Sequence, residues 1–289
     1  MSIDKAQCGN WMLHGPEKSQ IVMSQHDKSI LREWAKKLRE LAELPIQQEK
    51  VKLWTAHNDL KDTRPLIFIG PENGWNEIVP WNTLECEGEL AKDWEMWLRK
   101  EVIWGEKMKD DRVQEAKFYL PYTAVDTEWG VDTTPEGMEN VEKGGAYIFK
   151  PPIEDLETQL DLVKCPEIHM DEEATKMAYE LACEVFDGIL EVEIRHKWWH
   201  AMHITLDYAN LRGLEEMLYD FYDYPDEFHA LMRKITDGYK AKAKYLQDNG
   251  YLCYNSNSSY VGSGGYGFCS ELPAAGPQGQ STGARMEDM

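Results

Sequence analysis

The sequence predicts an α/β fold, and three observations lead to this prediction. Short apolar runs are bounded by glycine, proline or acidic residues, as buried strands are, and they alternate along the chain with longer segments of helical periodicity. The chain has 289 residues, of which 42% are hydrophobic and 11% aromatic, enough for a packed core. Strands that recur after helices indicate βαβ units, and hence a parallel sheet with right-handed crossovers.

The first half of the chain contains a helix, a strand and a second helix. An amphipathic helix is expected over residues 24–43, because its apolar residues recur at helical spacing: Ile30, Leu31, Trp34, Leu38 and Leu41. A short buried strand is expected over 66–69, followed by the loop Gly70-Pro71-Glu72-Asn73-Gly74-Trp75. Residues 89–107 again show helical periodicity, so this region reads as strand, loop and helix.

The second half continues the alternation. We expect, in order, a strand over 118–125 ending at Asp126, a helix over 172–186, a strand over 188–194, a helical region over 214–247 and a strand over 251–254. Pro121 weakens the first of these strands, and Pro225 breaks the helical region. Ligands of such sheets bind beyond the carboxyl ends of the strands, so the loops starting at Gly70, Asp126, Arg195 and Asn255 are candidate binding loops.

Charge and cysteine usage narrow the classes of partner. The chain carries 52 acidic and 31 basic residues, a net charge of -21, which repels nucleic acid and anionic membrane surfaces. It shows neither a leader-like segment nor a run of about 20 apolar residues, so we expect a cytoplasmic protein that binds neither nucleic acid nor membrane. The six cysteines are scattered without a CxxC pair and are expected to be reduced.

Several stretches together resemble the uroporphyrinogen decarboxylase superfamily. They are "TRPLIFIG", "FYLPYTAVDTEWG", "AYIFKPPIEDLETQLDLV" and "LRGLEEMLYDFYDYPDEFHALMRKITDGYKAKAKYLQDNGYL", in this order along the chain. The resemblance implies a TIM-type (β/α)8 barrel of which about four βα units are present. It divides the chain into an N-terminal helical extension, 1–60, and a C-terminally truncated uroporphyrinogen decarboxylase-like barrel, 61–289.

The resemblance also implies a site at the mouth of this barrel. Asp126 matches the catalytic aspartate of the family at the end of its second strand, although an aspartate beside Thr127 is also a common loop cap. The family binds its many-carboxylate substrate through an arginine in the loop after the first strand. Here that loop offers Glu72, Asn73 and Trp75 without an arginine, which favours a less anionic substrate. A tight turn with Trp75 in the core is the alternative.

Further candidate contacts follow the later strands. In "RHKWWHAMH", His196 and His200 are expected at the substrate site, and together with His203 they have the spacing of a metal site on a helix. The general-base glutamate of HExxH is absent, and the zinc-binding cysteines of the family would lie in the missing half, so no metal is predicted. Tyr122 and Asn255 complete the set of substrate contacts.

The resemblance implies three possible functions. The leading prediction is a methyltransferase-like enzyme that moves a methyl group between a small methylated substrate and a corrinoid carried by a separate protein. The alternatives are a decarboxylase of a small acid or tetrapyrrole, and a truncated barrel that acts only as a binding partner. Half a barrel leaves open sheet edges, which a homo-oligomer could cover.

Overall fold

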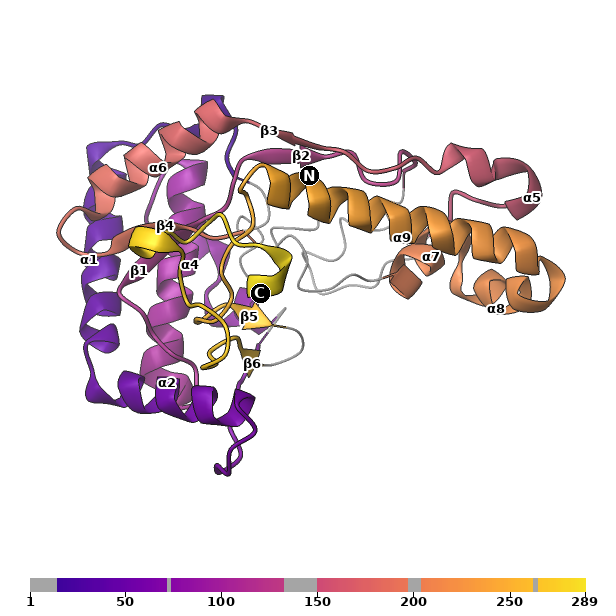
Figure 1. The fold of residues 1–289 in the computed structure, drawn as a ribbon. Helices are drawn as coiled ribbons and strands as arrows, with labels where there is room; N and C mark the ends of the chain where they lie inside the picture. Colours follow the sequence, from indigo (N-terminus) through magenta and orange to yellow (C-terminus); the bar gives the residue numbers. More distant parts are fainter. Residues whose placement is uncertain (1–14, 72–73, 133–149, 197–203, 262–264) are drawn as a thin grey trace.

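The computed structural model describes residues 15–71, 74–132, 150–196, 204–261 and 265–289. Helices and short strands are combined in two parts, a main lobe and a helical arm, which Figure 1 shows on the left and the right. The main lobe holds α1 (Gln25–Ala42), α2 (Pro45–Asn58), α4 (Glu89–Ile103), α6 (Glu172–Phe186), β1 (Lys117–Leu120) and β4 (Glu191–Ile194).

The core of the main lobe is built around a parallel pair of strands. β1 pairs with β4 from Lys117 opposite Glu191 to Leu120 opposite Ile194. Helices α1, α4 and α6 pack against this pair and contribute aliphatic and aromatic side chains to one buried cluster, including Leu31, Leu38, Trp94, Leu98, Phe118, Leu120, Val185 and Phe186. Ser24 caps α1 and Asp171 caps α6 by accepting a backbone N–H of the first turn. A parallel pair with a helix packed on it confirms the α/β class.

The arm has a separate hydrophobic core. It contains α5 (Leu156–Gln159), α7 (Ile204–Arg212), α8 (Leu214–Asp223) and most of α9 (Pro225–Asp248), whose buried side chains include Tyr208, Leu211, Phe228, Leu231 and Ile235. The antiparallel ribbon of β2 (Ala124–Asp126) and β3 (Ile168–Met170) connects it to the main lobe, and α9 runs alongside (Figure 1).

Gly238 allows α9 to pack closely against Trp129 and Pro166. A Cβ atom at this position would lie 2.6 Å from the Trp129 ring and 2.7 Å from Cδ of Pro166. Only glycine fits that approach without a shift of the neighbours, which explains a glycine inside a long helix.

The strand predicted over 66–69 is wrong. These residues are extended but belong to no strand, and Ile67 is 59% exposed. Asp111 and Asp110 take the place of a neighbouring strand, because their carboxylates accept the N–H groups of Ile67 at 2.8 Å and Ile69 at 2.9 Å. An apolar run bounded by turn formers does not reveal that side chains will satisfy its backbone.

Two other predicted strands need correction. The strand expected over 118–125 is divided at Pro121, which lacks an N–H, into β1 and β2, and these belong to different sheets. The strand expected over 251–254 is reduced to an isolated bridge between Cys253 and Thr282. The strand expected over 188–194 is confirmed as β4, and the helices expected over 24–43, 89–107, 172–186 and 214–247 are confirmed, the last as α8 and α9.

The strands of the described residues pair in twos. Besides β1 with β4 and β2 with β3, the short β5 (Tyr260–Val261) and β6 (Gly265–Tyr266) form an antiparallel pair. The expected boundary at residue 60 stays a prediction, and α1, on its N-terminal side, shares one core with β1. Among the described residues, no helix combines the length and the apolar character needed to span a membrane.

Candidate functional site

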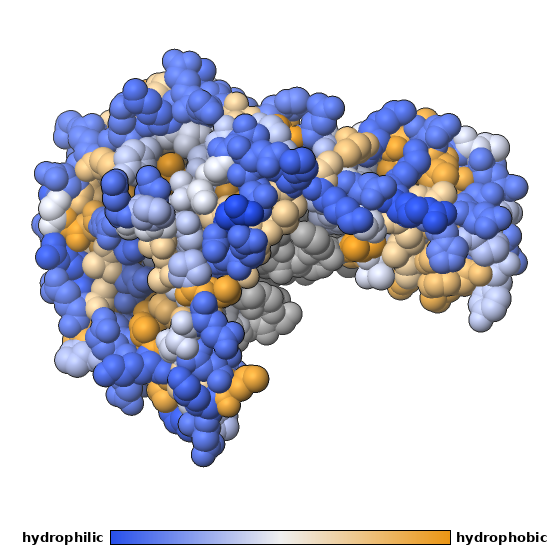
Figure 2. All heavy atoms as spheres, viewed as in Figure 1, coloured by the Kyte–Doolittle hydropathy of each residue, from blue (hydrophilic) through white to orange (hydrophobic). Residues whose placement is uncertain are grey.

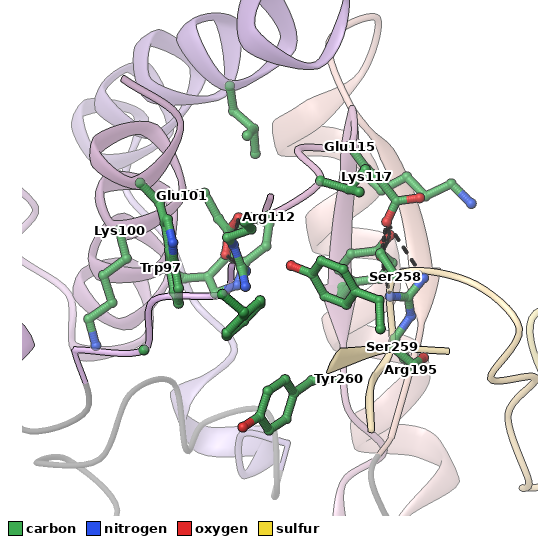
Figure 3. A pocket seen from close by; sticks show the side chains of 17 residues that line it. Trp97, Lys100, Glu101, Arg112, Glu115, Lys117, Arg195, Ser258, Ser259 and Tyr260 are labelled. Carbon is green, nitrogen blue, oxygen red and sulfur yellow. Dashed lines mark hydrogen bonds and ion pairs between the residues drawn. The ribbon is translucent and has the colours of Figure 1, made fainter. Parts of the chain in front are cut away.

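A cavity of about 310 Å3 lies between α4, β1 and four residues near the C-terminus, Ser258, Ser259, Tyr260 and Tyr266. Figure 3 shows the two walls, with Trp97 and Glu101 on α4 facing Glu115, Arg195 and Ser258 across it. Six aromatic rings contribute to the lining: Phe68, Trp97, Trp104, Tyr119, Tyr260 and Tyr266. A concave site with aromatic walls and a few polar groups is typical of a small-molecule pocket.

The alternation of β1 divides its side chains between core and cavity. Phe118 and Leu120 point into the buried cluster, while Lys117 and Tyr119 line the cavity. The side chains of a strand point alternately to opposite faces, so one short strand supplies both surfaces. The helix opposite continues through Trp104–Met108 as a π-helix, and Trp104 at its start is a wall residue.

Arg195 is the centre of the polar cluster on the β1 side. It follows β4 directly, and its side chain is only 9% exposed. Its guanidinium carbon lies 3.6 Å from the centre of the Tyr119 ring, and Nη1 donates to Ser258 Oγ at 2.9 Å. Nη2 lies 3.4 Å from Glu193 and 4.0 Å from Glu115. These contacts fix the guanidinium at the cavity wall.

Glu115 is the shared acceptor of this cluster. Both the hydroxyl of Tyr119 and the hydroxyl of Ser258 donate to its Oε2. Burial raises the pKa of Tyr119 well above its usual value, and the opposing charge of Arg195 does not reverse this. Tyr119 is therefore a neutral phenol whose hydroxyl donates a hydrogen bond to a carboxylate, and it does not act as a base at neutral pH.

A second arginine lies on the α4 side. Arg112 forms an ion pair with Glu101 through Nε and Nη2, and its guanidinium stacks on Trp104 at 3.9 Å from the ring centre. Gln114 also approaches Glu101, at 3.5 Å. Stacking on the indole holds the planar guanidinium group of Arg112 in one orientation at the cavity wall.

The lining carries more positive than negative charge. Four basic side chains, Lys100, Arg112, Lys117 and Arg195, line the cavity with two acidic ones, Glu101 and Glu115. This local excess contrasts with the net charge of -21 for the whole chain. Part of this charge is balanced by Glu193, whose carboxylate lies 2.5 Å from Lys117 Nζ and 3.4 Å from Arg195 Nη2.

The residues predicted from the loop after residue 69 are distributed differently. Glu72 and Asn73 lie outside the described residues. Trp75 is fully buried, packs against Trp104 at 5.1 Å and belongs to a hydrophobic cluster with Val79 and Met96. The alternative interpretation of Trp75 as a core residue therefore fits its position.

Tyr122 and His196 lie near each other but do not line the cavity. Their rings are 6.3 Å apart, and Tyr251 packs on Tyr122 at 5.1 Å. Burial raises the pKa of Tyr122 to about 12. His196 is buried, and its backbone N–H donates to Cys253 Sγ at 3.3 Å. His200 lies outside the described residues.

Asp126 and Asn255 also lie off the cavity lining. The Asp126 carboxylate accepts hydrogen bonds from Lys242 Nζ and, at 3.0 Å, from the N–H of Glu128. Asn255 is half-buried, and its carbonyl accepts the N–H of Asn257 at 2.7 Å. The predicted polar loop at Asn255 does reach the cavity, but three residues later, at Ser258.

The predicted contacts did not include the two arginines of the cavity. Arg112 precedes β1 and lies outside the four candidate binding loops. Arg195 begins one of these loops, directly after β4, a position where a parallel strand delivers side chains to a ligand. From that loop, only the histidines were predicted as contacts. Within the described ranges, no cluster of three or more histidine, cysteine or acidic side chains has the arrangement of a metal site.

Comparison of the chain with protein-family models, curated proteins and solved structures found no match. The assignment of the cavity as the candidate site therefore depends on its geometry alone. The resemblance to the uroporphyrinogen decarboxylase superfamily stays a prediction.

Proposed function

We propose that this protein is an enzyme that binds a small molecule in the aromatic cavity between α4 and β1, and that it transfers a methyl group from this molecule to a corrinoid on a separate protein. The observation that carries the proposal is the cavity itself, with six rings and two fixed ion-pair clusters around about 310 Å3. Its volume suits a small substrate. The methyl acceptor is expected from the resemblance alone.

The proposed fold is a TIM-type barrel of the uroporphyrinogen decarboxylase-like type, of which the parallel pair β1 and β4 would form part. β1 pairs with β4 in parallel, and α6, which lies between them along the chain, packs against both strands. This arrangement supports the proposed fold. In such a barrel the side chains just after the strands face the substrate, which suits Arg195. Asp126 lies off the lining of this cavity, so the catalytic role that the resemblance implies for it is not part of this proposal.

The aromatic walls suit a methylated substrate because methyl groups pack favourably on ring faces. Desolvation inside the cavity also strengthens nearby polar contacts with the substrate. Glu115 and Ser258 would orient a polar substituent, since Glu115 already holds two hydroxyl groups in place. The methyl acceptor must approach from outside, because the cavity takes a small molecule.

A second candidate function is decarboxylation of a small acid. The sequence offered no arginine in the first loop, but Arg112 and Arg195 both line the cavity. Their guanidinium groups have the geometry that binds a carboxylate through two hydrogen bonds. A tetrapyrrole with many carboxylates fits less well, because Glu101 and Glu115 already neutralise part of this charge.

One experiment distinguishes the candidates. Purified protein is incubated with reduced cobalamin and a panel of methylated amines, thiols and aryl ethers, and methylcobalamin is followed by its absorbance. A parallel incubation with small aromatic and aliphatic acids, without cobalamin, measures released carbon dioxide. Methylcobalamin formation supports methyl transfer, cobalamin-independent carbon dioxide supports decarboxylation, and ligand binding without either product supports a non-catalytic binding partner.

Matched variants connect the activity to the cavity. Tyr260→Ala removes a wall residue, whereas Tyr179→Ala removes an exposed tyrosine of α6 that does not line the cavity. We expect the first to lower turnover or ligand affinity by about tenfold and the second to leave both unchanged. Equal effects of the two substitutions would contradict the assignment of this cavity.

A further inference from the structure

The helix α8 is oriented with its apolar side chains outward. Leu214, Leu218, Phe221 and Tyr222 recur at the spacing of one helix face, and all four are exposed, Leu214 by 65% and Tyr222 by 87%. Figure 2 shows tan and orange atoms along the lower side of the arm, where Figure 1 places α8. We call these four residues the α8 stripe.

The inward side of α8 has Met217 packed against the arm core and Asp220 fully buried, and the contacts of Asp220 fix this orientation of the helix. Asp220 is the one fully buried residue of the helix, and its carboxylate accepts from Tyr208 at 2.9 Å and from Arg212 at 3.0 and 3.1 Å. Rotating α8 to bury the stripe would withdraw Asp220 from Arg212 and leave a buried charge unpaired.

Acidic residues border the α8 stripe. From Leu214 to Met232 the chain contains no lysine or arginine, and its acidic residues are Glu215, Glu216, Asp220, Asp223, Asp226 and Glu227. Apart from the buried Asp220, these carboxylates are exposed or half-exposed. The surface therefore combines an apolar centre with a negative rim.

We propose that the α8 stripe is a docking surface for a basic amphipathic helix of a partner protein. Such a helix would place leucine-like side chains on the stripe and lysine or arginine side chains against the acidic rim. This proposal is independent of the reaction in the cavity.

Charge favours a basic helix over two other possible occupants of the α8 stripe, a second copy of this chain and an anionic membrane. A second copy docking through the same face would bring two acidic rims together, and like charges across an interface are unfavourable. An anionic membrane would be repelled by the same rim and by the net charge of -21. A partner with basic residues gains from both the apolar centre and the rim.

The test uses a synthetic helical peptide of about 20 residues with leucines on one face and lysines beside them. A second peptide carries glutamates in place of the lysines, and binding to the full chain is measured by fluorescence anisotropy. We expect the lysine peptide to bind and the glutamate peptide not to bind. Leu218→Asp combined with Tyr222→Asp should weaken binding by about tenfold or more.

Controls separate this surface from general attraction to an acidic protein. Val22→Asp alters an apolar residue that is 70% exposed on the main lobe and should leave peptide affinity unchanged. Glu215→Gln with Glu216→Gln should weaken binding and reduce its dependence on salt. Since these residues are exposed, circular dichroism should show all variants folded. Equal affinity of the stripe variant and Val22→Asp, or dimerisation through the stripe in sedimentation velocity, would overturn the proposal.

Discussion

The guanidinium of Arg195 lies over the ring of Tyr119, with its carbon 3.6 Å from the ring centre. The same ring carries the hydroxyl that donates to Glu115, so one tyrosine holds both charged members of the cluster. Arg195 is nearly buried, which strengthens the cation–π attraction compared with an exposed pair. The cavity wall is therefore held by coupled contacts, and removing any one of them affects the others.

Substitutions of Tyr119 should separate the ring from the hydroxyl. Tyr119→Phe keeps the ring and is expected to lower the free energy of unfolding by about 1 kcal/mol through the lost hydrogen bond. Tyr119→Leu also removes the support of Arg195 and should cost about 2 kcal/mol more. Urea unfolding followed by tryptophan fluorescence measures both, and a loss of similar size in the two variants would contradict a role for the ring.

Asp220 should be essential to the arm. Asp220→Ala leaves the Arg212 guanidinium buried without its carboxylate, and we expect a loss of about 3–5 kcal/mol in the free energy of unfolding. Asp223→Ala, an exposed position on the same helix, should change it by less than about 0.5 kcal/mol. Chemical denaturation of both variants provides the comparison, and a mild effect at Asp220 would show that the ion pair is dispensable.

Gly238→Ala should destabilise the protein although alanine favours helices. The added Cβ would meet the Trp129 ring at 2.6 Å, and such overpacking costs about 1–3 kcal/mol. Thermal unfolding measures the loss. In a Trp129→Leu background the penalty should shrink but not vanish, because the clash with the ring is removed while Pro166 Cδ at 2.7 Å remains. A penalty of unchanged size there would mean that the clash with the Trp129 ring is not its origin.

Asp59 makes the attachment of the C-terminal segment sensitive to acid. Hydrogen bonds from the backbone and hydroxyl of Ser270, together with Lys61, lower the pKa of this carboxyl from 3.8 to about 2. Its contribution to stability is complete above the unfolded pKa and is lost as the pH falls from about 4 to about 2. NMR titration should report the low pKa, and Asp59→Asn should weaken the pH dependence of unfolding in this window. A pKa near 4 would contradict the contact.

The described cysteines should differ in reactivity. Cys253 is buried, and burial raises the pKa of its thiol to about 11, whereas Cys165 is exposed. We expect a maleimide at pH 8 to label Cys165 quickly and Cys253 only after unfolding. Mass spectrometry of digested protein locates the label, and Cys165→Ser identifies the fast site. Rapid labelling of Cys253 in folded protein would show that this region opens.

The helices of this protein were more predictable than its strands. The periodic apolar residues of α1, such as Leu31 and Leu38, form the core that their spacing predicts. Ile67 and Ile69 form an equally apolar run, but their backbone N–H groups are bound by carboxylates more than 40 residues away in sequence. Periodicity carries no information about such distant partners, and this is why the predicted strand was wrong.

The candidate site was predictable only as a region. The sequence pointed to the loops that follow residues 194 and 254, and side chains from both, Arg195 and Ser258, line the cavity. The sequence predicted only a helix for the segment that carries Trp97 and Trp104. Spacing alone does not distinguish rings that face a cavity from rings that face a core. Their role depends on which elements pack opposite α4.

The ion pair between Asp126 and Lys242 has a mechanical consequence. It ties β2 to α9, the two elements that run side by side from the main lobe to the arm. Two elements that lie side by side and are joined by an ion pair resist bending better than either element alone. Movement of the arm relative to the main lobe must therefore either break this ion pair or deform the 24-residue helix α9. The ion pair thus adds to the stiffness that the β2–β3 ribbon and α9 give to the link between the two cores.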